Sequence, residues 1–258
     1  MVTTEFRIPG SVAIVTGSSS GIGKRIAEQF AADGIDTVVC SREQGNVDPV
    51  ANEINESDRP GRALPIECDV RDEASVESMV ERTVEEFGGL DILVNNAGAA
   101  FMVEFDEMSR NAWDTILDIN LNGVFNCTHA ASDALKDGGG SVVNVSSVRG
   151  QEASPNETHY GAAKAAVENF TKSLAHEWAE DDVRVNCVAP GFIATKSAVS
   201  AGDVDPAGID RSAVDRRIGR VEEIADVVEF LVSDAASFVI GEVLTVRGVP
   251  THSEKPER

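Results

Sequence analysis

The segment Thr16-Gly17-Ser18-Ser19-Ser20-Gly21-Ile22-Gly23 joins an apolar run of strand length, residues 12–16, to a stretch of helical periodicity that begins near residue 22. Its glycines permit a tight turn in which the backbone can approach a pyrophosphate closely. The N-terminus of the following helix adds free N–H groups and the positive end of the helix dipole. A tight turn without a ligand would have the same sequence, so the turn alone does not establish a nucleotide site.

Outward from this turn, apolar runs of strand length alternate with stretches of helical period. The expected strands are residues 12–16, 37–40, 63–68, 92–95, 141–146, 183–188 and 242–246. The expected helices are about 22–33, 73–87, 111–135, 158–179 and 221–231. This alternation predicts an α/β fold of the doubly wound Rossmann type, with a seven-stranded, mainly parallel sheet and helices on both faces.

Polar segments interrupt the pattern in two places. Residues 45–61 contain Pro49 and Pro60, and residues 196–210 are rich in small side chains, so both are expected to be loops. The chain shows no internal repeat or linker. Residues 1–258 are therefore expected to form a single dinucleotide-binding and catalytic domain, in which the polar tail 251–258 is mobile.

The charge of the chain is strongly acidic. It contains 44 acidic and 22 basic residues, a net charge of −22. Such an excess repels nucleic acid and anionic membrane surfaces, so neither is an expected partner. Concentrated salt would screen the self-repulsion, because the Debye length falls to about 3 Å at 1 M. The composition favours a halophilic host, with an ordinary acidic enzyme from a mesophile as the alternative.

Composition also bears on location and on metals. The chain lacks an apolar run of about 18 residues, and Glu5 and Arg7 interrupt its start, so neither a membrane span nor a signal peptide is expected. The expected location is cytoplasmic. The four cysteines and four histidines show no ligand spacing. We expect no catalytic metal, and we expect the cysteines to be reduced and buried.

Further motifs follow the glycine-rich turn in order. They are Asn95-Asn96-Ala97-Gly98 at the end of the fourth expected strand, Asn120, Ser147, the pair Tyr160 and Lys164, and Pro190-Gly191 before Thr195. With these motifs and the spacing Gly-x-x-x-Gly-x-Gly, residues 12–246 resemble the short-chain dehydrogenase/reductase family. The resemblance implies an NAD(P)(H)-dependent oxidoreductase that interconverts an alcohol and a carbonyl group, as an alcohol dehydrogenase or carbonyl reductase does.

Tyr160 is the only tyrosine, and Lys164 lies on the same face of its predicted helix. A nearby ammonium favours the phenolate of a group whose reference pKa is about 10. By resemblance, Tyr160 exchanges a proton with the substrate oxygen, and Ser147 binds that oxygen, with Ser146 as the alternative. Lys164 would also bind the nicotinamide ribose. Asn120 would hold a water that links Lys164 to solvent, or would only distort its helix.

The same resemblance implies a set of cofactor-binding residues. These are Gly17, Ser19, Ser20, Gly21, Ile22, Gly23, Ser41, Arg42, Asp69, Val70, Asn96, Ala97, Gly98, Tyr160, Lys164, Pro190, Gly191, Ile193 and Thr195. Ser41 and Arg42 stand where an acidic residue would select NAD, and a guanidinium suits a phosphate, so NADP(H) is favoured over NAD(H). Ser20 replaces the basic residue of many NADP-dependent relatives. A solvated Arg42 and dual specificity therefore stay open.

Asp69 would accept a hydrogen bond from the adenine amino group. Residues 99–103, 148–154, Phe192 and the 196–214 segment would rim the substrate cleft, where Arg149 could attract an acidic substrate or face solvent. The resemblance implies a small carbonyl or alcohol compound as the substrate. A 3-oxoacyl thioester reductase and a glucose-type sugar dehydrogenase are the enzyme alternatives. A catalytically silent dinucleotide sensor is the alternative outside enzymes.

The end of the chain departs from the family. After Val246 it reads Arg247-Gly248-Val249-Pro250, where most relatives have Asp-Gly-Gly, and this puts family contacts made by that segment in doubt. The resemblance implies a homotetramer whose interface is formed by the expected helices 111–135 and 158–179. Ala162, Ala165 and Ala166 could allow close helix packing there, or could face the sheet.

Overall fold

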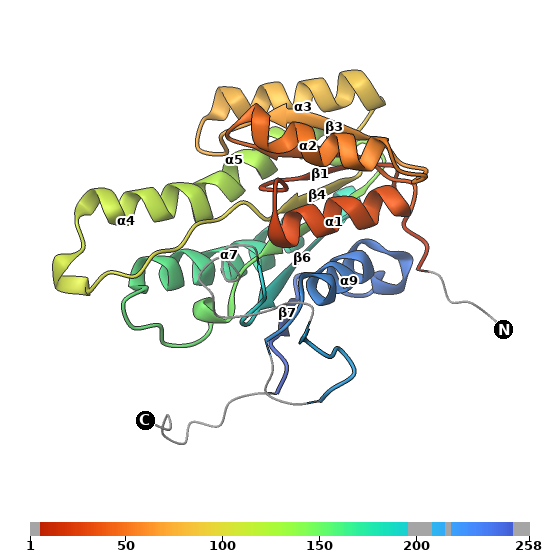
Figure 1. Ribbon diagram of the computed structural model, residues 1–258. Helices are drawn as coiled ribbons and strands as arrows, with labels where there is room; N and C mark the ends of the chain where they lie inside the picture. The colour runs from red at the N-terminus through yellow and green to blue at the C-terminus, as the bar shows by residue number, and fades with distance from the viewer. Residues whose placement is uncertain (1–5, 196–207, 215–217, 250–258) are drawn as a thin grey trace.

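The computed structural model describes residues 6–195, 208–214 and 218–249 (Figure 1). Seven parallel strands form one sheet in the order β3-β2-β1-β4-β5-β6-β7. The strands are β1 (Val12–Val15), β2 (Asp36–Ser41), β3 (Ala63–Glu67), β4 (Ile92–Asn95), β5 (Gly140–Val145), β6 (Val183–Pro190) and β7 (Val243–Val246). The predicted doubly wound α/β fold is confirmed, with strand ends displaced by at most two residues.

Helices cover both faces of this sheet. They are α1 (Gly21–Ala32), α2 (Gln44–Asn55), α3 (Glu73–Phe87), α4 (Arg110–Leu117), α5 (Gly123–Ala130), α6 (Ser132–Lys136), α7 (Thr158–Glu177) and α9 (Val221–Val232). Short turns of helix are η1 (Phe105–Glu107), η2 (Asp118–Asn122), η3 (Val148–Gly150), η4 (Ala179–Asp181) and η6 (Asp234–Ala236).

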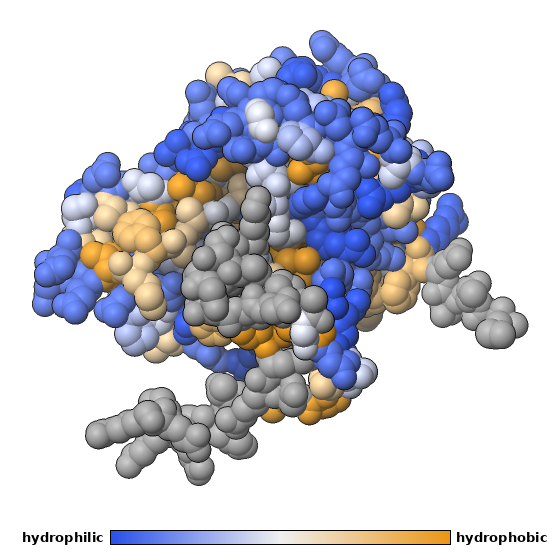
Figure 2. All heavy atoms as spheres, in the orientation of Figure 1, coloured by the Kyte–Doolittle hydropathy of each residue, from blue (hydrophilic) through white to orange (hydrophobic). Residues whose placement is uncertain are grey.

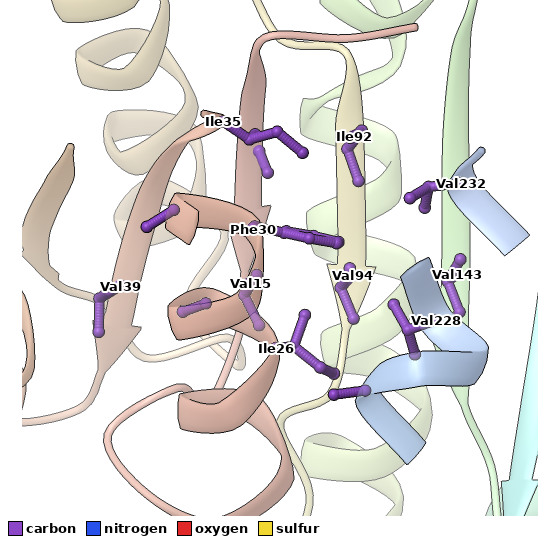
Figure 3. Packing of buried hydrophobic residues seen from close by; sticks show 14 of the residues in the cluster. Val15, Ile26, Phe30, Ile35, Val39, Ile92, Val94, Val143, Val228 and Val232 are labelled. Carbon is purple, nitrogen blue, oxygen red and sulfur yellow. The ribbon is translucent and has the colours of Figure 1, made fainter. Parts of the chain in front are cut away.

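Two apolar clusters hold these layers together. Ala13 and Val15 of β1 belong to one cluster and Val12 and Ile14 to the other, because successive side chains of a strand point to opposite faces. Figure 3 shows the first cluster, in which α1 and α9 pack their side chains over β1, β4 and β5. Phe30 at its centre is 1% exposed. Burial on both faces explains why the strands read as continuous apolar runs.

The expected loop 45–61 is wrong over residues 45–55. Helix α2 occupies Gln44–Asn55 and contains Pro49. Val47, Val50, Ala51 and Ile54 recur at helical spacing and are buried in the first cluster. Their burial outweighs the one backbone hydrogen bond that a proline inside a helix cannot donate. Proline is therefore a poor stop signal where an apolar stripe continues past it.

The single helix expected over 111–135 is also corrected. It is divided into α4, a wider π-type turn η2, α5 and α6. The side-chain amide of Asn120 donates to Ile116 O, at 3.0 Å, and so occupies a carbonyl inside the helix. Single π turns of this kind interrupt helices where a side chain inserts, often at functional sites.

Other expectations concern the remaining parts of the chain. Cys40, Cys68, Cys127 and Cys187 all lie in the described part of the chain, and each is buried and free of a disulfide. Of the expected loop 196–210, only residues 208–210 are described, and the tail 251–258 lies outside the described residues. Among the described residues, no helix has both the length and the apolar character needed to cross a membrane.

Candidate active site

The glycine-rich turn packs directly against the loop after β4. Gly17 has a φ of +62°, and a Cβ there would lie 2.8 Å from Ala97 Cα. Thr16 Oγ1 accepts hydrogen bonds from the backbone N–H groups of Asn96 and Ala97, each at 2.9 Å. The Asn96 amide donates to Thr16 O at 2.9 Å. Glycine at this position therefore serves both the left-handed turn and the close approach of two loops.

The N-terminus of α1 opens onto a cavity of about 300 Å³. Ser20 stands at the N-cap with extended backbone, and in the described part of the chain its hydroxyl makes no capping hydrogen bond. The first N–H groups of the helix therefore remain available to a phosphate. The cavity is lined by Gly17, Ser19, Ser20, Ser41, Arg42, Cys68, Asp69, Val70, Ala97, Gly98, Ala99 and Ile119.

This lining brings together residues that the sequence predicts to bind the adenosine and pyrophosphate parts of the cofactor. Nine of the predicted cofactor residues line the cavity, and the elements that carry them meet at the carboxyl ends of β1, β2, β3 and β4. Gly21 lines a neighbouring cavity of about 400 Å³ with Ser19 and Ser20. Ligands of open α/β sheets bind at such carboxyl ends, where the strand order reverses between β1 and β4.

Cationic groups gather at the far end of the cavity. Arg42 is exposed after β2. Both carboxylate oxygens of Asp69 accept from Arg71 Nε, at 2.9 and 3.1 Å. The hydrogen bonds from Arg71 lower the pKa of Asp69, and the charge of Arg42 lowers it further. Two guanidinium groups and one carboxylate therefore stand together beyond the carboxyl ends of β2 and β3.

Ser147 follows β5 and begins the turn η3. Its Oγ accepts a hydrogen bond from Arg149 N at 3.2 Å, so the hydroxyl sits at the N-cap of that turn. Ser146, the alternative candidate, is buried, and its Oγ donates toward Lys164 O at 3.1 Å and Glu168 Oε1 at 3.0 Å. The Ser147 hydroxyl, unlike that of Ser146, influences the pKa of the Tyr160 phenol and lowers it.

Tyr160 and Lys164 project from α7 toward the same place. Lys164 Nζ lies 5.6 Å from the centroid of the Tyr160 ring and donates to Val145 O at 2.9 Å. Burial lowers the pKa of Lys164 to about 8. Burial raises the pKa of Tyr160 above its ordinary value, and contact with the Ser147 hydroxyl lowers it in part. A phenol, an alcohol and an easily deprotonated ammonium are thus held together.

Asn120 is buried behind this group. Its amide donates to Ala99 O at 2.8 Å, in addition to Ile116 O. A Cβ on Gly98 would lie 2.9 Å from Asn120 Oδ1 and 3.6 Å from Lys164 Nζ. Gly98 is therefore the spacer across which the asparagine and lysine side chains face each other.

The segment after β6 completes the site. Gly191 N donates to Val246 O at 2.9 Å, and Thr195 faces the turn at Gly21, where a Cβ would lie 3.6 Å from Thr195 Cγ2. Ile193 forms a bridge with Gly219. The residues from Pro190 to Thr195 therefore pass from the catalytic group to the glycine-rich turn.

Known proteins share both this fold and most of this chain's length. A family model described as Enoyl-(Acyl carrier protein) reductase matches residues 17–248. The 3-oxoacyl-(acyl-carrier-protein) reductase of Thermotoga maritima is 37% identical over 247 residues, covering 94% of this chain and 98% of that protein. A short-chain type dehydrogenase/reductase from Mycobacterium marinum superposes with a TM-score of 0.85 at 34% identity, covering 94% and 96% of the two chains. The chain belongs to the short-chain dehydrogenase/reductase family.

This short-chain dehydrogenase/reductase is therefore an oxidoreductase with a Rossmann-type nucleotide-binding fold, as predicted. Relatives of similar identity are named for different substrates. The cis-4-hydroxycyclohexanecarboxylate dehydrogenase of Sinomonas cyclohexanicum is 40% identical over 240 residues, covering 92% of this chain and 95% of that protein. Family membership thus fixes the reaction class without fixing the substrate.

Three residues of this short-chain dehydrogenase/reductase were missed by sequence reasoning. Thr16 organises the loop after β4, Arg71 engages Asp69, and Glu168 accepts hydrogen bonds under the Ser147 turn. A threonine at the end of a strand and a charge two residues from Asp69 are weak signals alone. The spacing of Glu168, four residues after Lys164, placed it on the same helix face and was the usable clue.

Proposed function

We propose that the chain is an NADP(H)-dependent reductase of 3-oxoacyl thioesters. The observation that carries the proposal is the buried Lys164, whose Nζ lies 5.6 Å from the centroid of the Tyr160 ring and next to Gly98 of the cavity lining, with the Ser147 hydroxyl near enough to lower the pKa of Tyr160. The name of the Thermotoga maritima relative supports the thioester substrate. The bound nicotinamide supplies or accepts the hydride when the substrate carbonyl is reduced or the alcohol oxidised.

Tyr160 is the proposed acid and base. During reduction its phenol donates a proton to the substrate oxygen, and during oxidation its phenolate removes that proton. The raised pKa of Tyr160 keeps the phenol protonated in the protein without a ligand, which suits the role of an acid. Ser147 Oγ would donate to the same oxygen and hold it in line.

Lys164 is the proposed source of the proton that returns to Tyr160. Its pKa of about 8 lies close to neutrality, so the ammonium can release and regain a proton during turnover. Asn120 faces Lys164 across Gly98 and is the group that would hold a linking water. Lys164 would also bind the ribose hydroxyls of the cofactor.

Exposed apolar side chains in the segments that the sequence predicts to rim the substrate cleft favour an acyl chain over a sugar. Phe101 is 40% exposed, Met102 69% and Phe192 74%. Figure 2 shows apolar side chains among hydrophilic ones on the part of the surface near α4 and the loop that precedes it. Such side chains offer no hydrogen bonds to the hydroxyl groups of an aldose. Arg149 lies 5.5 Å above the Phe192 ring, where it could meet an acidic group on the substrate.

Arg42 supports NADP(H) over NAD(H). Its exposed guanidinium stands beside the cavity, and Arg71 already neutralises Asp69, so this end carries little net negative charge to repel a 2′-phosphate. Titration with NADPH and NADH, followed by nucleotide fluorescence, tests this preference. Equal affinity for both nucleotides would contradict it.

A substrate panel tests the function itself. NADPH oxidation is measured with acetoacetyl-CoA and crotonyl-CoA, and NADP⁺ reduction with glucose and cis-4-hydroxycyclohexanecarboxylate. The proposal predicts the highest kcat/KM for acetoacetyl-CoA. Preference for crotonyl-CoA would indicate an enoyl reductase, preference for glucose a sugar dehydrogenase, and binding without turnover a dinucleotide sensor.

The proposal extends to a single-domain homotetramer in the cytoplasm of a halophile. Phe125 of α5 is 50% exposed and stacks on His129, and Ala162 and Ala165 are exposed on α7, so small and apolar groups occupy the helix faces that would pair. Light scattering in molar salt tests the assembly, and a monomer would contradict it.

A thermal midpoint that rises with KCl supports the halophilic origin, and one that is independent of KCl contradicts it.

A further inference from the structure

Glu168 is a buried carboxylate of α7 that the proton path above does not use. It is 9% exposed and lies one helical turn beyond Lys164. Its Oε1 accepts from Ser146 Oγ at 3.0 Å and from Gln151 Nε2 at 3.1 Å. These two donors stand immediately before and four residues after Ser147. Glu168 Oε1 therefore accepts hydrogen bonds from both sides of the turn that begins at Ser147.

The same turn touches α7 at two further points through glycine. A Cβ on Gly150 would lie 2.9 Å from Ala165 N, and a Cβ on Gly161 would lie 2.9 Å from Arg149 O. At each point, backbone atoms of one segment occupy the space that a side chain on the facing glycine would need. The turn η3 and helix α7 therefore cannot move closer together without a clash. The distance between Ser147 and Tyr160 is consequently set by how η3 lies on α7.

The hydrogen bonds continue beyond Gln151 to the edge of the sheet. Gln151 Oε1 accepts from Thr245 Oγ1 of β7 at 3.0 Å. The neighbouring Glu152 pairs with Arg247, which follows β7. Glu168 is thus the inner end of a chain of contacts from α7 through the Ser147 turn to β7.

We propose that Glu168 is a positioning residue, whose Oε1 holds Ser146 and Gln151 and thereby fixes the Ser147 hydroxyl against the Tyr160 phenol. The proposal rests on the proposed function, which assigns these two groups to proton transfer. A carboxylate that merely satisfied buried donors would affect stability alone. A positioning residue must also change the environment of Tyr160 when it is removed.

The single tyrosine makes that environment measurable without substrate or cofactor. Because Tyr160 is the only tyrosine, phenolate absorbance in a pH titration reports on it alone. The Ser147 contact lowers the pKa of Tyr160, so displacement of Ser147 raises the titration midpoint. Tryptophan fluorescence from Trp113 and Trp178 shows, in the same samples, whether the protein stays folded.

Three variants separate the explanations. Glu168→Leu removes the acceptor, and we expect a higher phenol midpoint and a kcat for acetoacetyl-CoA reduction about tenfold to hundredfold lower, with KM and NADPH affinity within about twofold. Glu168→Gln keeps an acceptor oxygen where both donors converge and is expected to restore the midpoint and most of the kcat. Glu177→Leu, at an exposed position of the same helix, is the matched control and should change neither.

An unchanged phenol midpoint in folded Glu168→Leu protein would overturn the proposal, as would a Glu168→Gln protein that behaves like Glu168→Leu. Should Glu168→Leu fail to fold, Gln151→Leu removes one donor at an exposed position and is expected to shift the midpoint in the same direction. An unchanged midpoint there is equally contrary. Failure of the wild type to reduce acetoacetyl-CoA would overturn the proposed function and leave the tyrosine titration as a separate test.

Discussion

The proposed catalytic end and the proposed adenosine end of the site are held in different ways. At the catalytic end, Lys164 is 3% exposed and donates to a backbone carbonyl, and the Ser147 turn lies in backbone contact with α7. At the adenosine end, Arg42 is exposed, and the Arg71 and Asp69 side chains of the ion pair are 39% and 29% exposed. Buried hydrogen bonds fix geometry, whereas solvated charges mainly bias affinity. Substitutions at the catalytic end should lower kcat, and substitutions at the adenosine end should change the preference between NADPH and NADH.

With Tyr160 and Lys164 left in place, the largest loss of turnover is expected from removal of the Ser147 hydroxyl. Loss of one aligned donor to a developing negative charge costs about 10²–10³ in kcat. Ser147→Ala should therefore lower kcat for acetoacetyl-CoA by that factor with NADPH affinity unchanged, measured by steady-state kinetics and fluorescence titration. Ser146→Ala removes one of the two hydrogen bonds to Glu168 and should cost less than Ser147→Ala, and a larger loss there would reassign the role.

Replacing Lys164 should separate activity from stability. The pKa of Lys164 falls from 10.5 to about 8 on folding, so the unfolded chain binds more protons between these values and stability rises with pH across that window. Below about pH 8 the buried ammonium costs about 3 kcal/mol. Lys164→Met should be inactive and unfold at a higher temperature than the wild type near pH 7, with the gain shrinking above pH 8. A less stable variant at pH 7 would contradict the burial argument.

The adenosine end should respond more weakly. Arg42→Ser is expected to lower NADPH affinity about tenfold, since a hydrogen bond to a charged group contributes about 1.5–3 kcal/mol and this one is exposed. NADH affinity and the kcat at saturating nucleotide should not change. A loss shared equally by NADPH and NADH would mean that Arg42 does not meet the 2′-phosphate.

The smallest expected effect is that of salt on nucleotide preference. Raising KCl from about 0.2 M to about 1 M shortens the Debye length to about 3 Å and should reduce the NADPH preference of the wild type about twofold to threefold. The ratio of wild-type to Ser147→Ala turnover should stay constant across the same range. Salt dependence of that ratio would show that the catalytic end is also held by solvated charge.

Sequence reasoning predicted the strands and a mainly parallel sheet, because continuous apolar runs are local signals, and the glycine spacing predicted a cofactor turn after the first strand. It missed α2, where burial of Val47, Val50 and Ile54 outweighs Pro49. It predicted α4 and α5 as one helix. The hydrogen bond from the Asn120 side chain to Ile116 O, which widens the helix at η2, leaves no mark in the spacing of apolar residues.

Sequence reasoning could not predict contacts between residues far apart in the chain. Glu168 meets Ser146 across 22 positions, and Gln151 meets Thr245 across 94, so these pairs become visible only once the sheet is assembled. The Asp69–Arg71 pair is local, yet two charges two residues apart more often point away from each other. The roles given to Asn120, Ser147, Tyr160 and Lys164 remain predictions. That these residues lie near one another follows from the fold.

The most direct test of the central claim compares wild type with Tyr160→Phe. NADPH oxidation with acetoacetyl-CoA is followed by nucleotide absorbance, and NADPH binding is measured on the same samples. We predict turnover by the wild type and a loss of about 10²–10⁴ in Tyr160→Phe that far exceeds any change in NADPH binding, because the ring is kept and only the hydroxyl that donates the proton is removed. Unchanged turnover in Tyr160→Phe would contradict the assignment of Tyr160 as the acid and base.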